Sequence, residues 1–193
     1  MRKVVLQEFM SIDGCVAGPH DSVDFIPAST QGDLTFGRQQ LALMDTVDAL
    51  LLGRVTYEMF SGFWPNVPDG AEKEFAEKFN AVPKVVFSKT LKRAPWGKWH
   101  EGRIVTGSAV EEVVKLKRQP GKDLLVSGSI SVAQSLIDAS LVDEYRLVLC
   151  PVVLGGRPLF RTNLKMPPLQ LMNATTLDRG GVSLIYKQAA AAA

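Results

Sequence analysis

The sequence predicts an α/β protein whose central sheet is mostly parallel and ends in an antiparallel hairpin. Short apolar runs alternate with segments of helical periodicity through most of the chain, which is the pattern of successive strand–helix units. Near the C-terminus, residues 169–177 and 182–186 flank Asp178-Arg179-Gly180-Gly181, a turn sequence that joins antiparallel strands. No linker or repeat divides the chain, so residues 1–188 are expected to form one domain.

Residues 4–10 are rich in β-formers and predict the first strand. The glycine-, proline- and aspartate-rich segment 14–32 predicts a long loop, a feature that is usually functional in a compact domain. Residues 33–45 show helical periodicity, and the fully apolar run 49–52 predicts a buried parallel strand. Further helices are expected at 56–60, 71–79, 132–139 and after Ser108, and further strands at 84–87, 104–105, 124–126 and 145–149.

Composition narrows the class of protein. The chain has 193 residues, of which 46% are hydrophobic and 22% charged, as in ordinary globular proteins. Its formal charge of +2 gives no reason to expect a nucleic-acid partner. No apolar run approaches the ~20 residues of a membrane span, and residues 1–6 are too short for a signal-peptide core, so a cytoplasmic location without a membrane partner is expected. The alanine tail, 189–193, is expected to lie outside the fold.

Histidines and cysteines give no sign of a metal site. Cys15 and Cys150 are far apart and lack paired spacing, which predicts reduced thiols. His20 and His100 have no companion at metal-ligand spacing. No metal is therefore expected.

Small and hydroxylated residues follow three of the predicted strands. Because ligands of parallel α/β sheets bind at the carboxyl ends of the strands, these residues are candidates for one site. Arg54 is a cation beside a helix start, where backbone amides can hold phosphate. Each end alone is also explained by ordinary turn chemistry, and Ser129 by helix capping, but together they favour a phosphorylated ligand. The three ends are Gly53-Arg54-Val55-Thr56, Ser88-Lys89-Thr90 and Ser127-Gly128-Ser129-Ile130-Ser131.

The chain resembles the dihydrofolate-reductase-like superfamily, and within it the reductase domain of riboflavin-biosynthesis deaminase-reductases. The resemblance runs from Val4 to about Tyr186. Its landmarks are Ser11-Ile12-Asp13-Gly14, Gly53 to Glu58, Phe63-Trp64-Pro65, Pro83 to Leu91, Ser127-Gly128-Ser129, Leu141 to Glu144 and Pro151 to Phe160. The fold that it implies is the dihydrofolate-reductase-like three-layer α/β fold.

This resemblance implies NADPH as the cofactor, bound along the three strand ends. Arg54 and Thr56 match the family's phosphate contact, and Ser88 and Lys89 match the segment near the adenosine 2′-phosphate, where a cation favours NADPH over NADH. Ser127 to Ser131 match the pyrophosphate turn. Ser127-Gly128 replaces the glycine pair that is usual in dihydrofolate reductases.

Two carboxylates are candidates for orienting or protonating a substrate. Asp33 lies where dihydrofolate reductases place their acidic helix residue, and Asp13 follows the first strand and is expected to face the same cleft. A helix cap explains Asp33 equally well, and a turn before Gly14 explains Asp13. Phe36 is a candidate for stacking on the substrate, and Trp64 for the pocket wall, the core or a dimer interface.

Two functions follow from these residues. The first is an NADPH-dependent reductase that transfers a hydride to a small pterin-like, pyrimidine-like or carbonyl substrate, as the riboflavin-pathway reductase and dihydrofolate reductase do. The second is a nucleotide-binding module of the same fold without efficient reductase activity. By analogy with the family, a homodimer is expected, with residues 145–154 and the C-terminal hairpin as the candidate interface.

Overall fold

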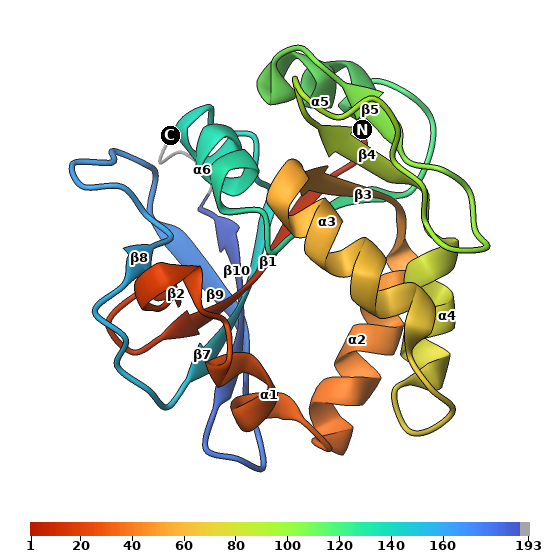
Figure 1. The fold of residues 1–193 in the computed structure, drawn as a ribbon. Coiled ribbons are helices and arrows are strands. Elements are labelled where there is room, and N and C mark those ends of the chain that lie inside the picture. Colours follow the sequence, from red (N-terminus) through yellow and green to blue (C-terminus); the bar gives the residue numbers. More distant parts are fainter. Residues whose placement is uncertain (190–193) are drawn as a thin grey trace.

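The computed structural model describes residues 1–189, in which an eight-stranded sheet carries helices on both faces (Figure 1). The strand order is β5-β4-β3-β6-β1-β7-β10-β9; β10 is antiparallel to β7 and to β9, and the other neighbours are parallel. The predicted fold class is therefore confirmed. The strands are β1 (Val4–Ser11), β3 (Val47–Gly53), β4 (Lys84–Phe87), β5 (Arg103–Val105), β6 (Asp123–Ser127), β7 (Glu144–Cys150), β9 (Leu169–Thr176) and β10 (Val182–Gln188).

The helices pack on two separate cores because alternate strand residues point to opposite faces of the sheet. Val4, Leu6 and Leu124 pack with α5 (Ala109–Lys117) and α6 (Ile130–Asp138). Their neighbours Val5 and Leu125 pack with the helices of the other face. Those helices are α2 (Leu34–Thr46), α3 (Arg54–Phe63) and α4 (Lys73–Ala81).

Capping residues explain where two of the helices begin. Asp33 accepts a hydrogen bond from Phe36 N at 2.7 Å and caps α2, and Ser108 accepts one from Glu111 N at 3.4 Å and caps α5, as predicted. Both ends of α3 differ from the prediction of 56–60. The helix starts at Arg54 and continues into a 3₁₀ turn, η2 (Trp64–Asn66), before the chain leaves the helical conformation.

The segment 14–32 is more structured than the long loop that its composition predicts. It contains β2 (Cys15–Ala17), the 3₁₀ turn η1 (Pro19–Asp21) and α1 (Phe25–Thr30). The partner of β2 is β8 (Arg157–Pro158), about 140 residues away along the chain. A three-residue strand with so distant a partner leaves no periodic signal in its own sequence.

Strand β7 lies inside the sheet, between β1 and β10. Of the residues proposed for a dimer interface, Tyr145, Leu147 and Val148 are therefore buried in the protein's own core. The edge strand β9 is mostly exposed. At the other end of the hairpin, Ala189 N donates to Pro168 O at 2.9 Å, while residues 190–193 of the expected tail lie outside the described residues.

The sheet opens between β1 and β6. Val4 to Gln7 pair with Leu124 to Ser127, where β6 ends. Beyond Gln7, β1 continues to Ser11 and keeps only β7 as its neighbour. The carboxyl end of β1 therefore borders an opening in the sheet, which is where ligands of parallel α/β sheets bind. Within residues 1–189, no helix has the length and apolarity that crossing a membrane requires.

Candidate functional site

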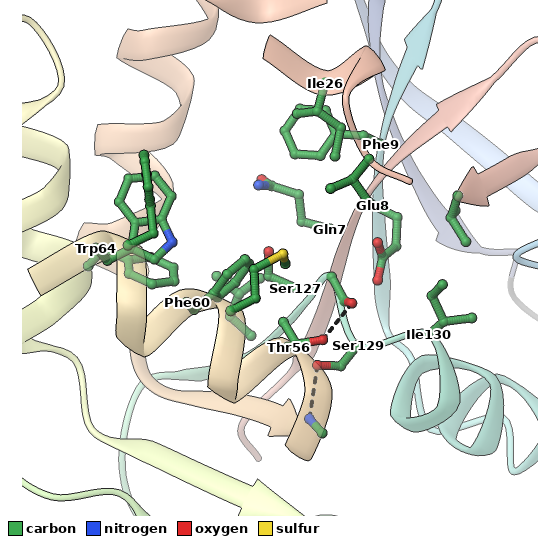
Figure 2. Close-up of a pocket in the computed structure, with 18 of the residues that line it drawn as sticks. Gln7, Glu8, Phe9, Ile26, Thr56, Phe60, Trp64, Ser127, Ser129 and Ile130 are labelled. Carbon is green, nitrogen blue, oxygen red and sulfur yellow. Dashed lines mark hydrogen bonds between the residues drawn. The ribbon is translucent and has the colours of Figure 1, made fainter. Parts of the chain in front are cut away.

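A cleft of about 1390 Å³ lies at the carboxyl ends of β1, β3, β4 and β6. It is larger than the usual ~300–1,000 Å³ of a small-molecule pocket, so it has room for a dinucleotide and a second ligand. All three predicted strand ends contribute to its lining. Figure 2 shows Phe60 and Trp64 on one side of the cleft, and Glu8 and Ile130 on the other.

Two of the three strand ends are hydrogen-bonded to each other. Thr56 Oγ1 donates to the carbonyl oxygen of Gly128 at 2.8 Å, and Gly53 N donates to Ser129 Oγ at 2.9 Å (Figure 2). The starts of α3 and α6 are thereby held side by side. Gly128 has a φ of 65°, and a Cβ there would lie 3.3 Å from side-chain atoms of both Phe60 and Thr56. This turn therefore requires glycine.

The start of α6 has an uncapped first turn. Ser129 occupies the N-cap position, but its side chain makes no capping hydrogen bond and instead binds Gly53 N. The capping interpretation of Ser129 is therefore wrong. Ile130 and Ser131 continue the cleft lining from this turn. Helix N-termini of this kind attract anionic groups through their amides and dipole.

The third strand end, after β4, is a turn closed by its own serine. Ser88 Oγ accepts hydrogen bonds from Thr90 N at 3.2 Å and Leu91 N at 3.0 Å. Lys89 and Thr90 are exposed and line the cleft. Arg54 also lines it, with its guanidinium hydrogen-bonded to Glu58 at 2.8 Å. Two cations, Arg54 and Lys89, are thus available to a ligand on this side.

The two predicted catalytic carboxylates have structural partners. Asp33 lines the cleft, but its Oδ1 accepts from Phe36 N at 2.7 Å and its Oδ2 from Asp178 N at 2.6 Å. Asp13 does not line the cleft, contrary to the expectation that it faces it. Its carboxylate accepts from Leu154 N, from Gly155 N and from Ser11 Oγ at 2.6–3.1 Å, and these bonds hold its pKa well below the usual range.

Aromatic side chains form part of the cleft lining. Phe36 stacks edge-to-face on Phe9 with ring centroids 5.7 Å apart, and both line the cleft. Trp64 packs within about 5 Å of Phe63, Phe75 and Phe79, and its buried indole nitrogen has no hydrogen-bond partner among the described residues. Trp64 therefore lies in both the cleft wall and an aromatic cluster.

The sequence interpretation missed two polar residues of β1. Gln7 and Gln40 of α2 exchange reciprocal amide hydrogen bonds at 2.8 and 3.2 Å in the cleft wall. Glu8 also lines the cleft and is 3% exposed. Burial raises the pKa of Glu8 to about 8, while the backbone amide of Gly128 acts in the opposite direction. The sequence did contain a signal for Gln7 and Glu8, because two adjacent polar residues interrupt an otherwise apolar strand.

No group of histidine, cysteine or acidic side chains suited to holding a metal ion is found within residues 1–189. Every peptide bond described is trans, including the one between Ser127 and Gly128. Among the polar groups that line the cleft are hydroxyls, amides, the cations Arg54 and Lys89 on the α3–β4 side and the buried carboxyl group of Glu8 on β1.

Comparison with known proteins shows which proteins the chain is similar to. YyaP of Bacillus subtilis, an uncharacterized protein, is 30% identical over 187 residues, which cover 96% of this chain and 94% of YyaP. A putative riboflavin biosynthesis protein from Shewanella sp. PV-4 has a similar structure, with a TM-score of 0.75, 22% identity and coverage of 97% and 99% of the two chains. Dihydrofolate reductase from Enterococcus faecalis, solved with NADP(H), has a TM-score of 0.60 at 14% identity over 97% of each chain.

The structural similarities confirm the predicted dihydrofolate-reductase-like fold. The model of the RibD C-terminal domain matches residues 2–183, almost the whole chain. That extent agrees with the resemblance inferred from the sequence motifs. The chain belongs to the RibD C-terminal domain family.

Proposed function

We propose that this chain is an NADPH-dependent oxidoreductase that transfers a hydride to a small heteroaromatic substrate, pterin- or pyrimidine-like, or to a carbonyl compound. The observation that carries the proposal is the meeting of the Gly53–Thr56 and Ser127–Ser131 segments through two direct hydrogen bonds. This contact joins two helix starts, each able to hold a phosphate group, in one cleft with Lys89.

The residues present fit such a cofactor. The uncapped first turn of α6 suits a diphosphate, because its amides are not engaged by the Ser129 side chain. Arg54 and Lys89 line the same cleft and supply positive charge for phosphate groups. NADPH, when bound, supplies the hydride from its nicotinamide ring.

The other half of the cleft suits a flat substrate. Phe36 offers an aromatic face, and Trp64 carries an indole N–H without a partner among residues 1–189. The Gln7–Gln40 pair presents amide groups that can exchange their mutual hydrogen bonds for bonds to ring nitrogens or carbonyl oxygens. The role of these side chains is to position the substrate and exclude water.

One observation favours the alternative, a nucleotide-binding module without efficient reductase activity. Both oxygens of Asp33 accept backbone hydrogen bonds, and Asp13 lies outside the cleft. Neither carboxylate therefore offers a ready proton donor on the substrate side.

A binding and turnover experiment separates the two. Titration with NADPH, followed by quenching of the fluorescence of Trp64, Trp96 and Trp99, tests the cofactor site. Oxidation of NADPH is then followed at 340 nm with a panel of pterins, aminopyrimidines and simple carbonyl compounds. Saturable binding with turnover supports the reductase, and binding without turnover across the panel favours the module. No binding of NADPH would refute both.

Lys89 provides a test of cofactor choice. We expect Lys89→Ala to weaken NADPH binding about tenfold and to leave NADH binding within about twofold, because only NADPH carries the 2′-phosphate that the ammonium group would contact. Titration calorimetry with both dinucleotides measures the ratio. Lys92→Ala, an exposed lysine of the same segment that does not line the cleft, is the matched control. Equal losses for NADPH and NADH would remove Lys89 from the 2′-phosphate role.

A further inference from the structure

Glu8 occupies a different side of the cleft from its neighbours on β1. Gln7 bonds to Gln40, and Phe9 stacks on Phe36, so both side chains face α2. Leu6, two residues before Glu8, packs in the core formed with α5 and α6. Because side chains alternate along a strand, Glu8 points to that second face, towards the start of α6. Figure 2 shows its carboxyl group directed towards the turn of Ser129 and Ile130.

The carboxyl group of Glu8 is buried without full hydrogen bonding. The residue is 3% exposed, and Oε1 has no hydrogen-bond partner among the described residues. Its neighbour on β7 is Leu147, and β6 ends one position before it, opposite Gln7. A polar atom left unpaired in such a place costs about 1–3 kcal/mol unless a water or a ligand binds it, which makes this oxygen a candidate for a ligand contact.

The surroundings of Glu8 favour a neutral carboxyl group. On β7, the cation next to the Glu8 partner Leu147 is Arg146, which is hydrogen-bonded to Glu144 at 2.7 Å. The turn before α6 contributes Gly128, Ser129 and Ile130, which carry no charge. No hydrogen bond joins Glu8 to any charged side chain within residues 1–189, and its pKa is raised to about 8. The other charged residues that line the cleft are Asp21, Asp24, Asp33, Arg38, Arg54, Glu72, Lys89 and Arg157.

We propose that Glu8 is a cofactor-binding residue whose carboxyl group must be protonated for an anionic dinucleotide to occupy the turn before α6. This inference rests on the proposed function, since it takes NADPH as the dinucleotide. An ionised Glu8 would be attracted to the Gly128 amide that the phosphate groups also require, and it would repel those phosphates in a site with little water. A protonated Glu8 has an O–H to donate to a ligand oxygen and no charge to repel it.

The pH dependence of NADPH binding tests the proposal. If only the protonated form binds, the apparent dissociation constant of the unaltered protein rises about 30-fold between pH 7 and pH 9.5 for a group with a pKa of about 8. Glu8→Gln keeps the shape and cannot ionise. We expect its dissociation constant to lie within about threefold of the unaltered protein at pH 7 and to change less than about threefold up to pH 9.5.

Proton uptake provides a second measurement that needs no variant. Calorimetric titration with NADPH at pH 8.5, in two buffers of different ionisation enthalpy, should show uptake of roughly 0.8 proton per NADPH bound. Glu8→Gln should remove most of that uptake. Glu74→Gln, an exposed residue of α4 outside the cleft lining, is the matched control and should retain it.

The outcomes distinguish this inference from the function on which it rests. Binding of NADPH by the unaltered protein with a flat pH profile, or an unchanged profile in Glu8→Gln, overturns the role of Glu8 and leaves the NADPH site standing. Absence of binding at every pH from 6 to 9.5 overturns both. Other groups that titrate in this range are present in both proteins, so the difference between the two profiles isolates Glu8.

Discussion

Two ionisable side chains on strands of the central sheet are equally buried, but their polar atoms are paired differently. Lys84, at the start of β4, and Glu8, towards the carboxyl end of β1, are each 3% exposed. Lys84 Nζ donates to Phe79 O at 2.9 Å and to Asn80 O at 2.5 Å, and it lies 4.3 Å from the ring centroid of Trp96. Glu8 leaves one carboxyl oxygen without a partner among residues 1–189.

The difference separates a structural group from a candidate ligand-binding group. Lys84 binds the carbonyl groups at the end of α4, where orphan acceptors and the helix dipole favour a cation. Asn80 extends this network, because it accepts from Trp96 Nε1 at 2.7 Å and donates to Trp64 O at 2.9 Å. Burial alone therefore does not identify a functional residue. Glu8 is the candidate because it combines an unpaired carboxyl oxygen with a place in the cleft lining.

The largest effect on stability is expected from breaking the hydrogen-bond network of Lys84. Lys84→Ala removes two hydrogen bonds to buried carbonyls and leaves a cavity against Trp96, so we expect a loss of about 3–4 kcal/mol in the free energy of unfolding. Urea denaturation followed by tryptophan fluorescence measures it. Lys165→Ala, an exposed lysine, should change stability by less than about 0.5 kcal/mol. A small effect at Lys84 would mean that its hydrogen bonds are replaced by water.

The pH dependence of stability should have opposite signs for the two groups. Folded Glu8, with a pKa of about 8, keeps a proton that the unfolded chain loses above pH 4.5, so its contribution falls as pH rises from about 4.5 to 8. Burial lowers the pKa of Lys84 to about 7 from 10.5, so its unfolded form binds the extra proton and its contribution rises with pH between those values.

Variants separate these two contributions. We expect Glu8→Gln to gain about 3–4 kcal/mol of stability relative to the unaltered protein between pH 5 and pH 8, because the variant has no carboxyl group to ionise. Lys84→Met should lose stability relative to the unaltered protein as pH rises from 7 to 10. Chemical denaturation at each pH measures both trends. Parallel curves for Glu8→Gln and the unaltered protein would contradict a raised pKa at Glu8.

The smallest effect on stability is expected at Asp33, a residue of the cleft whose carboxyl oxygens are both paired, unlike those of Glu8. Asp33 lines the cleft, but both of its oxygens have backbone partners, so we expect Asp33→Ala to act on stability, with a loss of about 1.5 kcal/mol. Asp33→Asn, which still caps a helix, should lose less. The dissociation constant for NADPH should change less than about threefold, because Asp33 precedes α2, on the other face from the α6 turn. A tenfold weakening would show that a satisfied carboxylate also contacts the cofactor.

The predicted elements and the observed ones agree where one segment carries its own pattern. The apolar run 49–52 lies within β3, and the turn of Asp178–Gly181 joins β9 to β10. The helical periodicity of 33–45 matches α2, which is shifted by one residue at each end. The prediction of a long loop over residues 14–32 is wrong at β2, because this strand exists only through its pairing with β8. Element ends also differed by a few residues, as at α3, since capping and the following 3₁₀ turn depend on packing.

In the candidate site, too, features of adjacent residues could be predicted from the sequence, and contacts between distant residues could not. The three strand ends were recognisable because glycine, hydroxyl and cationic residues follow apolar runs, and ligands of such sheets bind there. The hydrogen bonds of Asp33 to Asp178 and of Asp13 to Gly155 join residues more than 140 positions apart, so no local pattern could show that these carboxylates are already engaged.

By itself, the sequence determined the α/β class, the family motifs and the positions of the strand ends, because each depends on periodicity or on residues adjacent in the chain. Only the tertiary structure decided which polar groups are satisfied. Hydrogen bonding and desolvation depend on what surrounds an atom in space. Glu8 and Lys84 are equally buried, but only Lys84 has its polar group engaged by neighbouring carbonyls.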